Sequence, residues 1–314
     1  MTQAICLGNI VVDVVVRVVR SLPPRGKIKL VEKIQASLGG GAVNTGVSLA
    51  KLGVKTAIIG KIGNDEFGTL VLRKLEESGV DLRGIIKSSE IPTSATVSLV
   101  YEDGERGFFH FLGGNASLEE SEVNLELYPE AKWLHISSFF LIPKLDGEPA
   151  ANILKKGKQM KLFTSLDTTW DTKGRWISVL TPCLKFLDVL FLNFIEGKML
   201  TGKDKTEEIA DYFLSKGVGM VAIKMDKNGC FIKSREDNKG LKLPAYSVKV
   251  KDSTGAGDAF CAGFLIGILK GWDIERTGRF ANAAGASCIT EIGGTDGVSI
   301  ERIKAIINGA FPKI

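Results

Sequence analysis

The sequence of 314 residues has few cysteines and histidines, and it has no long apolar run. Its five cysteines are odd in number and widely spaced, which disfavours a disulfide framework and a zinc site. We expect them to be small core residues in a reducing compartment. No apolar run approaches the roughly 18 residues of a membrane span, and the first residues form no basic leader. The absence of both signals predicts a cytoplasmic protein that does not enter a membrane.

Charge of one sign is not concentrated anywhere in the chain. The 41 Lys and Arg residues slightly outnumber the 36 Asp and Glu residues, giving a net charge of +5 without a basic block. This distribution disfavours an extended nucleic-acid surface, but it is compatible with a small polyanionic ligand. Hydrophobic residues make up 44% of the chain, as is ordinary for a folded globular protein. The length allows one large α/β domain or two smaller ones, and composition does not divide it.

Strand-like and helical segments alternate along most of the chain. The expected strands are 133–136, 162–167, 189–192 and 220–224, with helices near 150–159 and 206–216 between them. This alternation predicts a parallel sheet covered by helices on both faces. We expect the first apolar run, 4–16, to be one strand of that sheet. The last third should be mainly helical, over 256–270, 275–290 and 300–308.

Two β-rich segments, about 14–38 and 94–113, interrupt this pattern. The second has an Asp-Gly turn signal at 103–104, which predicts a hairpin. Although the two segments are far apart in the sequence, they could pair into one small sheet over the sheet edge where ligands bind. We therefore predict that they form a lid.

The second β-rich segment carries alternating side chains. We expect Arg106, Phe108 and His110 to share one face, which would present a cation and a ring to a substrate. Phe109 and Phe111 should then pack against the sheet. An alternative is that the phenylalanines join the lids of two subunits, which would make the protein a homodimer.

The strongest motif is the segment 252–258, Asp-Ser-Thr-Gly-Ala-Gly-Asp, directly before an apolar helix. Small residues at a helix start expose backbone N–H groups, and with the helix dipole these bind phosphate oxygens. The amides of Gly255, Ala256 and Gly257 would stabilise the transferring charge, and Asp258 would take the proton of an attacking hydroxyl. The pattern favours phosphoryl transfer. Taken alone, it also fits a plain turn with Asp252 or Ser253 as helix cap.

A second glycine-rich segment, 39–44, opens the first expected helix. Gly40 and Gly41 permit close approach of the backbone to a ligand, and Asn44 offers both a donor and an acceptor to sugar hydroxyls. A flexible turn is the simpler interpretation. The spacing does not match the Gly-x-Gly-x-x-Gly pattern of dinucleotide-binding enzymes, which disfavours an NAD-dependent dehydrogenase.

These motifs together resemble the ribokinase-like, or PfkB, carbohydrate kinase family. The resemblance rests on 39–53 and 252–258, with the glycine-bounded turn 60–68 and the Asn-x-x-Glu element 193–196 between them, and it extends over residues 4–308. It implies a ribokinase-like three-layer α/β/α sandwich with a mainly parallel central sheet and a small β-sheet lid. It also implies that residues 1–314 form a single domain.

The resemblance implies specific roles for individual residues. Asp258 falls on the general base, and Gly255, Ala256 and Gly257 fall on the anion hole. Asp13, expected to end the first strand, falls on the residue that binds substrate hydroxyls. The other residues expected to bind substrate are Gly40, Gly41, Asn44 and Arg106.

The resemblance also implies cofactor sites. The residues expected to contact ATP are Asn193, Lys224, Gly229, Thr254, Gly257 and Asn282. Asn193 and Glu196 would order Mg²⁺, largely through water, and Asp252, Thr254, Cys288 and Gly293 approximate a monovalent-cation site for K⁺. The chain departs from the family at Asp226, where a glycine is usual, so the nucleotide loop is expected to differ in shape.

The predicted function is transfer of the γ-phosphate of ATP to a hydroxyl of a sugar or polyol. Ribokinases tend to carry Lys at the place of Gly41 and Asn at the place of Val11, so a hexose or ketose is favoured over ribose. A nucleoside such as adenosine is the alternative substrate. A regulator that binds nucleotide without catalysis is a further alternative, which the presence of Asp258 and its anion hole disfavours.

Overall fold

The computed structural model describes residues 1–102, 106–237 and 239–309, and in these ranges nine strands form one main sheet. The strands, in spatial order, are β13 (Leu241–Leu243), β12 (Cys230–Ser234), β11 (Met220–Lys224), β10 (Val189–Asn193), β9 (Phe163–Thr168), β8 (Trp133–Phe139), β1 (Ala4–Gly8), β4 (Thr56–Gly63) and β5 (Ile85–Ser88). All neighbouring pairs from β11 to β5 are parallel, whereas β12 pairs antiparallel with β11 and β13. The predicted, mainly parallel sheet is therefore present.

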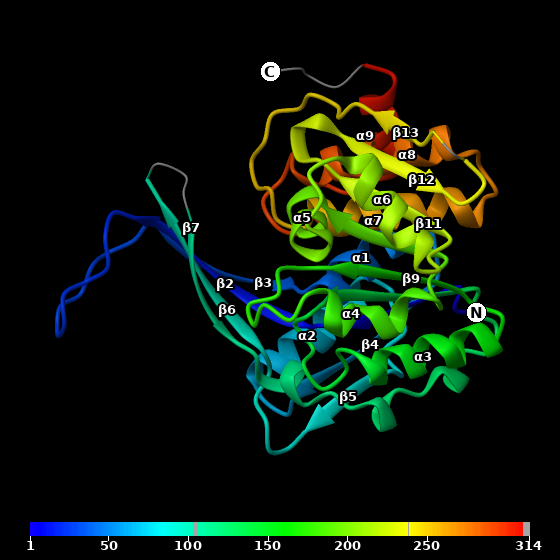
Figure 1. Ribbon diagram of the computed structural model, residues 1–314. Helices are drawn as coiled ribbons and strands as arrows, with labels where there is room; N and C mark the ends of the chain where they lie inside the picture. Colours follow the sequence, from blue (N-terminus) through cyan, green and yellow to red (C-terminus); the bar gives the residue numbers. More distant parts are fainter. Residues whose placement is uncertain (103–105, 238, 310–314) are drawn as a thin grey trace.

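Helices cover both faces of the main sheet (Figure 1). Alternate residues of β1 face opposite layers: Ile5 and Leu7 join one hydrophobic cluster, and Ala4 and Cys6 join the other. The first cluster includes residues of α3 (Glu148–Gln159), α4 (Ile177–Leu184), α5 (Phe194–Thr201) and α6 (Thr206–Ser215). The second includes residues of α1 (Gly41–Lys51), α2 (Glu66–Glu77), α7 (Ala256–Leu269), α8 (Ile274–Cys288) and α9 (Ile300–Ile307). The architecture is a three-layer sandwich.

Short helical turns and buried cysteines complete the body. The 3₁₀ turns are η1 (Gly113–Ser117), η2 (Glu120–Glu122), η3 (Leu125–Leu127) and η4 (Asp226–Asn228). All five cysteines are buried, as predicted for small core residues. In the described part of the chain, no helix has the length and apolar character needed to cross a bilayer.

A second, four-stranded sheet, which we call the small sheet, projects from the body (Figure 1). Its strands, in spatial order, are β3 (Lys33–Gly39), β2 (Val11–Val19), β6 (Ala95–Tyr101) and β7 (Arg106–Phe111). The central pair, β2 and β6, is parallel and joins segments that are far apart in the sequence. The predicted pairing of the two β-rich segments is confirmed. The predicted turn at 103–104 lies outside the described residues.

The first apolar run is not one strand, so that prediction was wrong. It divides at Asn9 and Ile10 into β1 of the main sheet and β2 of the small sheet. At this point the side chain of Asn115 takes the place of a strand partner: its Nδ2 donates to Ile10 O at 3.0 Å, and Ile10 N donates to its Oδ1 at 3.0 Å. Asp13 consequently lies within β2, opposite Ser37 and Thr96, and does not end the first strand.

The expected packing of Phe109 and Phe111 against a sheet was also wrong. Their exposed fractions are 61% and 52%, and Phe108 on the other face is 61% exposed. β7 is an edge strand of a sheet that projects from the body, so the described chain covers neither face of it (Figure 1). The aromatic side chains of β7 are thus exposed on both faces of the strand.

Candidate active site

Asp258 lies in the first turn of α7, where the sequence motif begins the helix. Gly255 caps the helix with φ of +77°, a left-handed conformation that favours glycine. A Cβ at this position would lie 2.1 Å from Gly294 O, so the backbone packs too closely for any side chain. The start of a helix leaves backbone N–H groups without intrahelical acceptors and carries a partial positive charge. Asp258 therefore stands beside groups that can bind an anion.

Asn44 on α1 contacts Asp258 directly. Its Nδ2 donates a hydrogen bond of 2.9 Å to Asp258 Oδ2, and Asn44 itself is buried. Burial raises the pKa of Asp258, while the Asn44 hydrogen bond and the nearby positive charge of Lys224 oppose that rise. The structure thus brings Asn44 and Asp258, from the two predicted motifs, into one site.

Gly40 and Gly41 begin α1 beside this contact. Gly40 has φ of +92°, and a Cβ there would lie 2.4 Å from Asn9 O. Gly41 N donates to Asn9 Oδ1 at 2.6 Å, which ties the start of α1 to the end of β1. A side chain at either glycine would collide with its surroundings, so this close approach requires the glycine-rich segment.

Lys224 ends β11 and forms a buried ion pair that the sequence did not reveal. Its Nζ lies 2.6 and 2.8 Å from the two carboxylate oxygens of Asp167 on β9. Burial raises the pKa of Asp167 to about 6, and the charge of Lys224 opposes that rise. Lys224 Nζ also lies 3.2 Å from where a Cβ of Gly257 would be, so it reaches the first turn of α7. The sequence carried one signal of this ion pair: an acidic residue, Asp167, and a basic residue, Lys224, end two of the predicted parallel strands.

Asn193 and Glu196 form a capping box at the start of α5. Glu196 N donates to Asn193 Oδ1 at 2.8 Å, and Asn193 N donates to Glu196 Oε2 at 3.0 Å. Asn193 Nδ2 and Thr168 Oγ1 also donate to the Glu196 carboxylate, both at 2.8 Å. Burial raises the pKa of Glu196, and Lys224 opposes that rise. The capping role is a sufficient structural reason for both residues.

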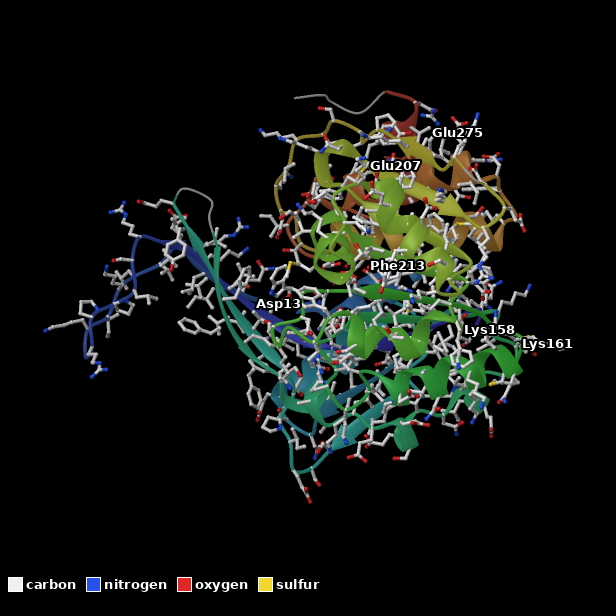
Figure 2. All side chains as sticks on the ribbon, viewed as in Figure 1. Asp13, Lys158, Lys161, Glu207, Phe213 and Glu275 are labelled. Carbon is white, nitrogen blue, oxygen red and sulfur yellow. The ribbon has the colours of Figure 1, made fainter. Side chains whose placement is uncertain are left out.

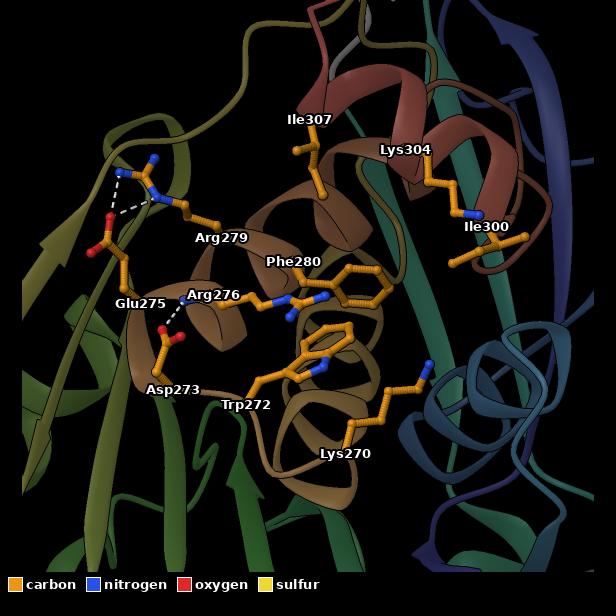
Figure 3. Close-up of a pocket in the computed structure, with 10 residues that line it drawn as sticks. All are labelled: Lys270, Trp272, Asp273, Glu275, Arg276, Arg279, Phe280, Ile300, Lys304 and Ile307. Carbon is orange, nitrogen blue, oxygen red and sulfur yellow. Dashed lines mark hydrogen bonds and ion pairs between the residues drawn. The ribbon is translucent and has the colours of Figure 1, made fainter.

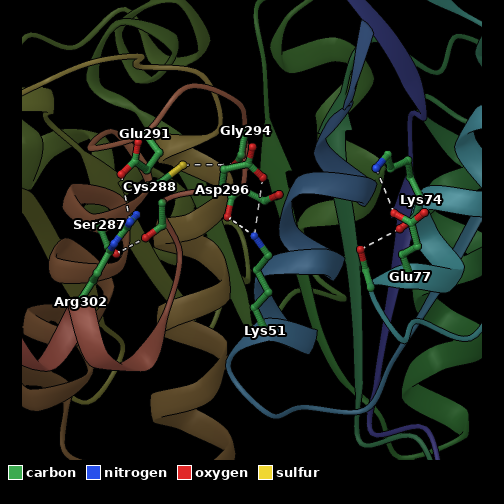
Figure 4. A network of polar contacts seen from close by, with 12 residues as sticks. Lys51, Lys74, Glu77, Ser287, Cys288, Glu291, Gly294, Asp296 and Arg302 are labelled. Carbon is green, nitrogen blue, oxygen red and sulfur yellow. Dashed lines mark hydrogen bonds and ion pairs between the residues drawn. The ribbon is translucent and has the colours of Figure 1, made fainter.

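The residues predicted for a monovalent cation lie together beside α7. Asp252 accepts hydrogen bonds from Thr254 N at 2.9 Å and from Gly293 N at 3.2 Å. Cys288 Sγ donates to Thr254 O at 3.4 Å and to Gly294 O at 3.2 Å, and Figure 4 shows the latter contact. In the same view Lys51 of α1 contacts Asp296, which joins α1 to the loop after α8.

The predicted nucleotide residues Gly229 and Asn282 lie near β13. Gly229 has φ of +86°, and a Cβ there would lie 2.0 Å from Leu243 O. Asn282 Nδ2 donates to Pro244 O at 3.0 Å. Asp226, where the resemblance leads us to expect glycine, adopts φ of +49°, so an aspartate takes a backbone conformation that favours glycine.

Asp13 lies on the small sheet near its junction with the body (Figure 2). A Cβ on Gly39 of the adjacent strand would lie 2.0 Å from Asp13 Oδ2, and a Cβ on Gly41 would lie 3.3 Å from Asp258 Oδ1. The glycine run therefore extends from one carboxylate to the other. Arg106 begins β7, and its side chain lies outside the described part of the chain.

A separate pocket of about 640 Å³ lies between the end of α7, α8 and α9 (Figure 3). Its lining includes Trp272, Arg276, Phe280 and Lys304, with the Arg276 guanidinium 4.2 Å from the centre of the Trp272 indole. It shares no residue with the site around Asp258. This pocket is thus separate from the candidate active site.

Comparison with known proteins gives consistent matches. A family model described as pfkB family carbohydrate kinase matches residues 1–301. An uncharacterized sugar kinase of Archaeoglobus fulgidus is 32% identical over 252 residues, which are 80% of this chain and 98% of the relative. The 2-dehydro-3-deoxygluconokinase of Bacillus subtilis is 28% identical over 284 residues, or 87% of each chain. The ribokinase of Thermotoga maritima has a TM-score of 0.83 at 25% identity, covering 98% of this chain and 100% of that one.

Proposed function

Since this chain belongs to the pfkB family of carbohydrate kinases, we propose that it transfers the γ-phosphate of ATP to a hydroxyl of a sugar or polyol. Its family and its sugar kinase relatives make it a carbohydrate kinase. The phosphate donor, the general base and the acceptor are the parts that we propose. The observation that carries the proposal is the position of Asp258, at the start of α7 and hydrogen bonded to Asn44.

In the proposed reaction Asp258 is the general base. The acceptor hydroxyl gives its proton to the Asp258 carboxylate as a lone pair of its oxygen forms the new bond to the γ-phosphorus. The bond between that phosphorus and the bridging oxygen breaks, and ADP leaves with the electron pair. The backbone N–H groups of Gly255, Ala256 and Gly257 are proposed to stabilise the charge on the transferring group.

The charges around Lys224 support a divalent cation bound together with ATP. Asp167, Glu196 and Asp258 all interact electrostatically with this one lysine, so carboxylates outnumber cations where polyphosphate is proposed to bind. Mg²⁺ typically binds through substrate phosphates and waters with few protein ligands. Asn193 and Glu196, whose polar atoms already form the capping box, are proposed to order its waters. When bound, the ion would neutralise phosphate charge.

The remaining cofactor contacts are proposed from the family resemblance. Lys224, Gly229, Thr254, Gly257 and Asn282, with Asn193, are proposed to contact ATP. Asp252, Thr254, Cys288 and Gly293 are proposed to surround K⁺ through backbone and carboxylate oxygens. Their proximity beside the start of α7 supports this second proposal.

The proposed acceptor lies between the two carboxylates joined by the glycine run. Asp13 would accept hydrogen bonds from its hydroxyls, with Gly40, Gly41, Asn44 and Arg106 completing the contacts. A hexose, a ketose or a related sugar derivative remains the favoured class, and the deoxygluconokinase relative acts on a compound of this kind according to its name. The small sheet is proposed to act as the lid over this acceptor.

The small sheet is also proposed to join two copies of the chain. Phe108, Phe109 and Phe111 are each more than half exposed on β7. They lie on both faces of this edge strand, and exposed aromatic side chains are typical of protein interfaces. A dimer through this surface would bury side chains that the described chain leaves in water.

The decisive experiment measures ATP consumption with Mg²⁺ and K⁺ over a panel of ketoses, aldoses, polyols, sugar acids and nucleosides. A strong sugar or polyol substrate whose phosphorylation is lost in Asp258→Asn supports the proposal. Selective phosphorylation of a nucleoside would show that the acceptor is a nucleoside and not a sugar or polyol. Turnover of an acceptor that stays at the wild-type rate in Asp258→Asn would refute the assigned base.

A further inference from the structure

We propose that Ser138 binds the acceptor hydroxyl together with Asp258, an inference that rests on the proposed kinase function. Ser138 lies near the carboxyl end of β8, and neither sequence motif includes it. A Cβ built on Gly41 would lie 2.4 Å from Ser138 Oγ and 3.3 Å from Asp258 Oδ1. The two side-chain oxygens therefore approach the same point beside Gly41. An acceptor placed next to this glycine would meet both.

The hydroxyl of Ser138 is available for this contact. Among the described residues, its side chain has no hydrogen-bond partner, and Ser138 is only partly buried. A serine hydroxyl can donate one hydrogen bond and accept others. Donating to the acceptor oxygen would occupy one lone pair of that oxygen, while the acceptor O–H donates to Asp258. The remaining lone pair would then face the phosphorus.

The backbone of Ser138 is held in an uncommon conformation. Ser138 has φ of +55°, and Phe140 two residues later has φ of +89°, both in the left-handed region that favours glycine. Such conformations persist where the surrounding structure imposes them, and they concentrate at functional sites. A serine kept at a position suited to glycine indicates a role for its hydroxyl.

The surroundings do impose this conformation. Phe140 N donates to Asp146 Oδ1 at 3.0 Å, and the fully buried Asp146 carboxylate pairs with Arg175 at 2.9 Å. Leu141 N donates to Ser138 O at 3.0 Å, and Thr169 N donates to Phe139 O at 3.1 Å. The turn after β8 is thus fixed by Asp146 in the loop that follows it and by Thr169 and Arg175 in the segment after β9. Ser138 Oγ is held at a defined place beside Asp258.

In the proposed step Ser138 moves no proton. The acceptor proton passes to Asp258, the acceptor oxygen bonds to the γ-phosphorus, and ADP leaves with the electrons of the broken bond. Ser138 keeps its own proton and orients the attacking oxygen. Losing it should therefore lower the efficiency of acceptor use without changing ATP binding.

The test compares Ser138→Gly and Ser138→Ala with Lys161→Gly. Lys161 has φ of +61° and is exposed, and Figure 2 shows it across the molecule from Asp13. Ser138→Gly and Lys161→Gly both relieve a left-handed backbone conformation, whereas Ser138→Ala keeps it and removes only the hydroxyl. Comparing the three variants separates the effect of the hydroxyl from that of backbone strain.

We expect both Ser138 variants to lower kcat/KM for the acceptor by about 10- to 100-fold, the loss of one hydrogen bond in the transition state. The KM for ATP should stay within about twofold of wild type, and Ser138→Gly should keep the wild-type Tm. Lys161→Gly should match wild type in kinetics. Acceptor kinetics of Ser138→Gly and Ser138→Ala within about twofold of wild type would overturn this inference alone. A wild-type protein that phosphorylates no acceptor would overturn it together with the proposed function.

Discussion

Asn44 Nδ2 and Asp258 Oδ2 lie 2.9 Å apart, although 214 positions separate them in the sequence. The contact joins the first turn of α1 to the first turn of α7, so two helix starts meet at one carboxylate. Because the amide donates its hydrogen, it favours the charged form of Asp258, which is the form that a general base requires. The glycine-rich segment would therefore serve the proposed phosphate side of the site as well as the proposed sugar side.

Replacing Asp258 by Asn should remove catalysis and retain binding. We expect kcat to fall by about 10²- to 10⁴-fold, since general-base catalysis contributes that much, with little change in ATP affinity. Because burial raises the pKa of Asp258, its charge costs stability above that pKa, and the variant should have a higher Tm at pH 8. The test measures ATP affinity by calorimetry, turnover and Tm for both the variant and the wild-type protein. Equal turnover in variant and wild type would remove Asp258 from the mechanism.

Replacing Asn44 by Leu should move the acid limb of the pH profile. The Asn44 hydrogen bond lowers the pKa of Asp258, so its loss raises that pKa and leaves less carboxylate at a given pH. The limb of kcat/KM against pH should shift to higher pH. Ser48→Ala, at a buried position of the same helix, is the control and should leave the limb in place. An unshifted limb in Asn44→Leu would show that another group sets it.

Replacing Lys224 by Met should destabilise the protein in a pH-dependent way. Removing one partner of a buried ion pair costs about 3 to 5 kcal/mol of unfolding free energy, since the other charge stays buried. Burial raises the pKa of Asp167 to about 6, and the positive charge of Lys224 limits that rise. Without Lys224, Asp167 therefore takes up a proton more readily. The loss should be smaller at pH 5 than at pH 8, measured by urea unfolding. Lys233→Met is the control, because its partner Asp211 is 57% exposed and can be hydrated.

Replacing Gly39 by Ala should mimic the loss of Asp13. The new Cβ would lie 2.0 Å from Asp13 Oδ2, so the carboxylate must move away. We expect the KM for the acceptor to rise by about 10-fold or more, as in Asp13→Ala, with the KM for ATP unchanged. Gly107→Ala is the control within the small sheet, because its Cβ would meet only ordinary contacts of 3.5 Å from Tyr101. Unchanged acceptor KM in both Gly39→Ala and Asp13→Ala would exclude Asp13 from the acceptor site.

Replacing Phe108 and Phe109 together by Ser should separate the proposed dimer. Large aromatic side chains in an interface commonly contribute 2 kcal/mol or more, so we expect the dissociation constant to rise by at least about 30-fold. Light scattering after size-exclusion chromatography measures the mass over a range of concentrations. Ile307→Ser, at an exposed position of α9, should leave the mass unchanged. A wild-type monomer at high micromolar concentration would contradict the proposed interface.

Elements with a clear local pattern were predictable from the sequence. β11 has the predicted bounds, and α7 ends within one residue of its prediction, because each is an apolar run that begins directly after a glycine. The division of the first apolar run was not predictable in this way. Both halves are apolar, and the break depends on Asn115, more than a hundred residues away in the sequence.

The candidate active site, too, could be predicted only in part from the sequence. The glycines and Asp258 lie in compact motifs, so their proximity could be inferred from the sequence. The Lys224–Asp167 pair joins two strands on either side of β10, and Ser138 approaches Gly41 from a third strand. Such contacts depend on strand order and on backbone conformation, which local composition does not encode. Exposure of Phe109 likewise depends on the projection of the small sheet from the body.

Two of the connections between the small sheet and the body are very short. Asn9 and Ile10 join β1 to β2, and Gly40 alone joins β3 to α1. Gly41 N is hydrogen bonded to Asn9 Oδ1, so these two connections are fixed to each other at their base. A rotation of the sheet would therefore turn the first helical turn that carries Asn44. For the proposed lid and the proposed base, closure over an acceptor and the orientation of Asp258 would then be one coupled movement, so the strength of the base would depend on whether the acceptor is held.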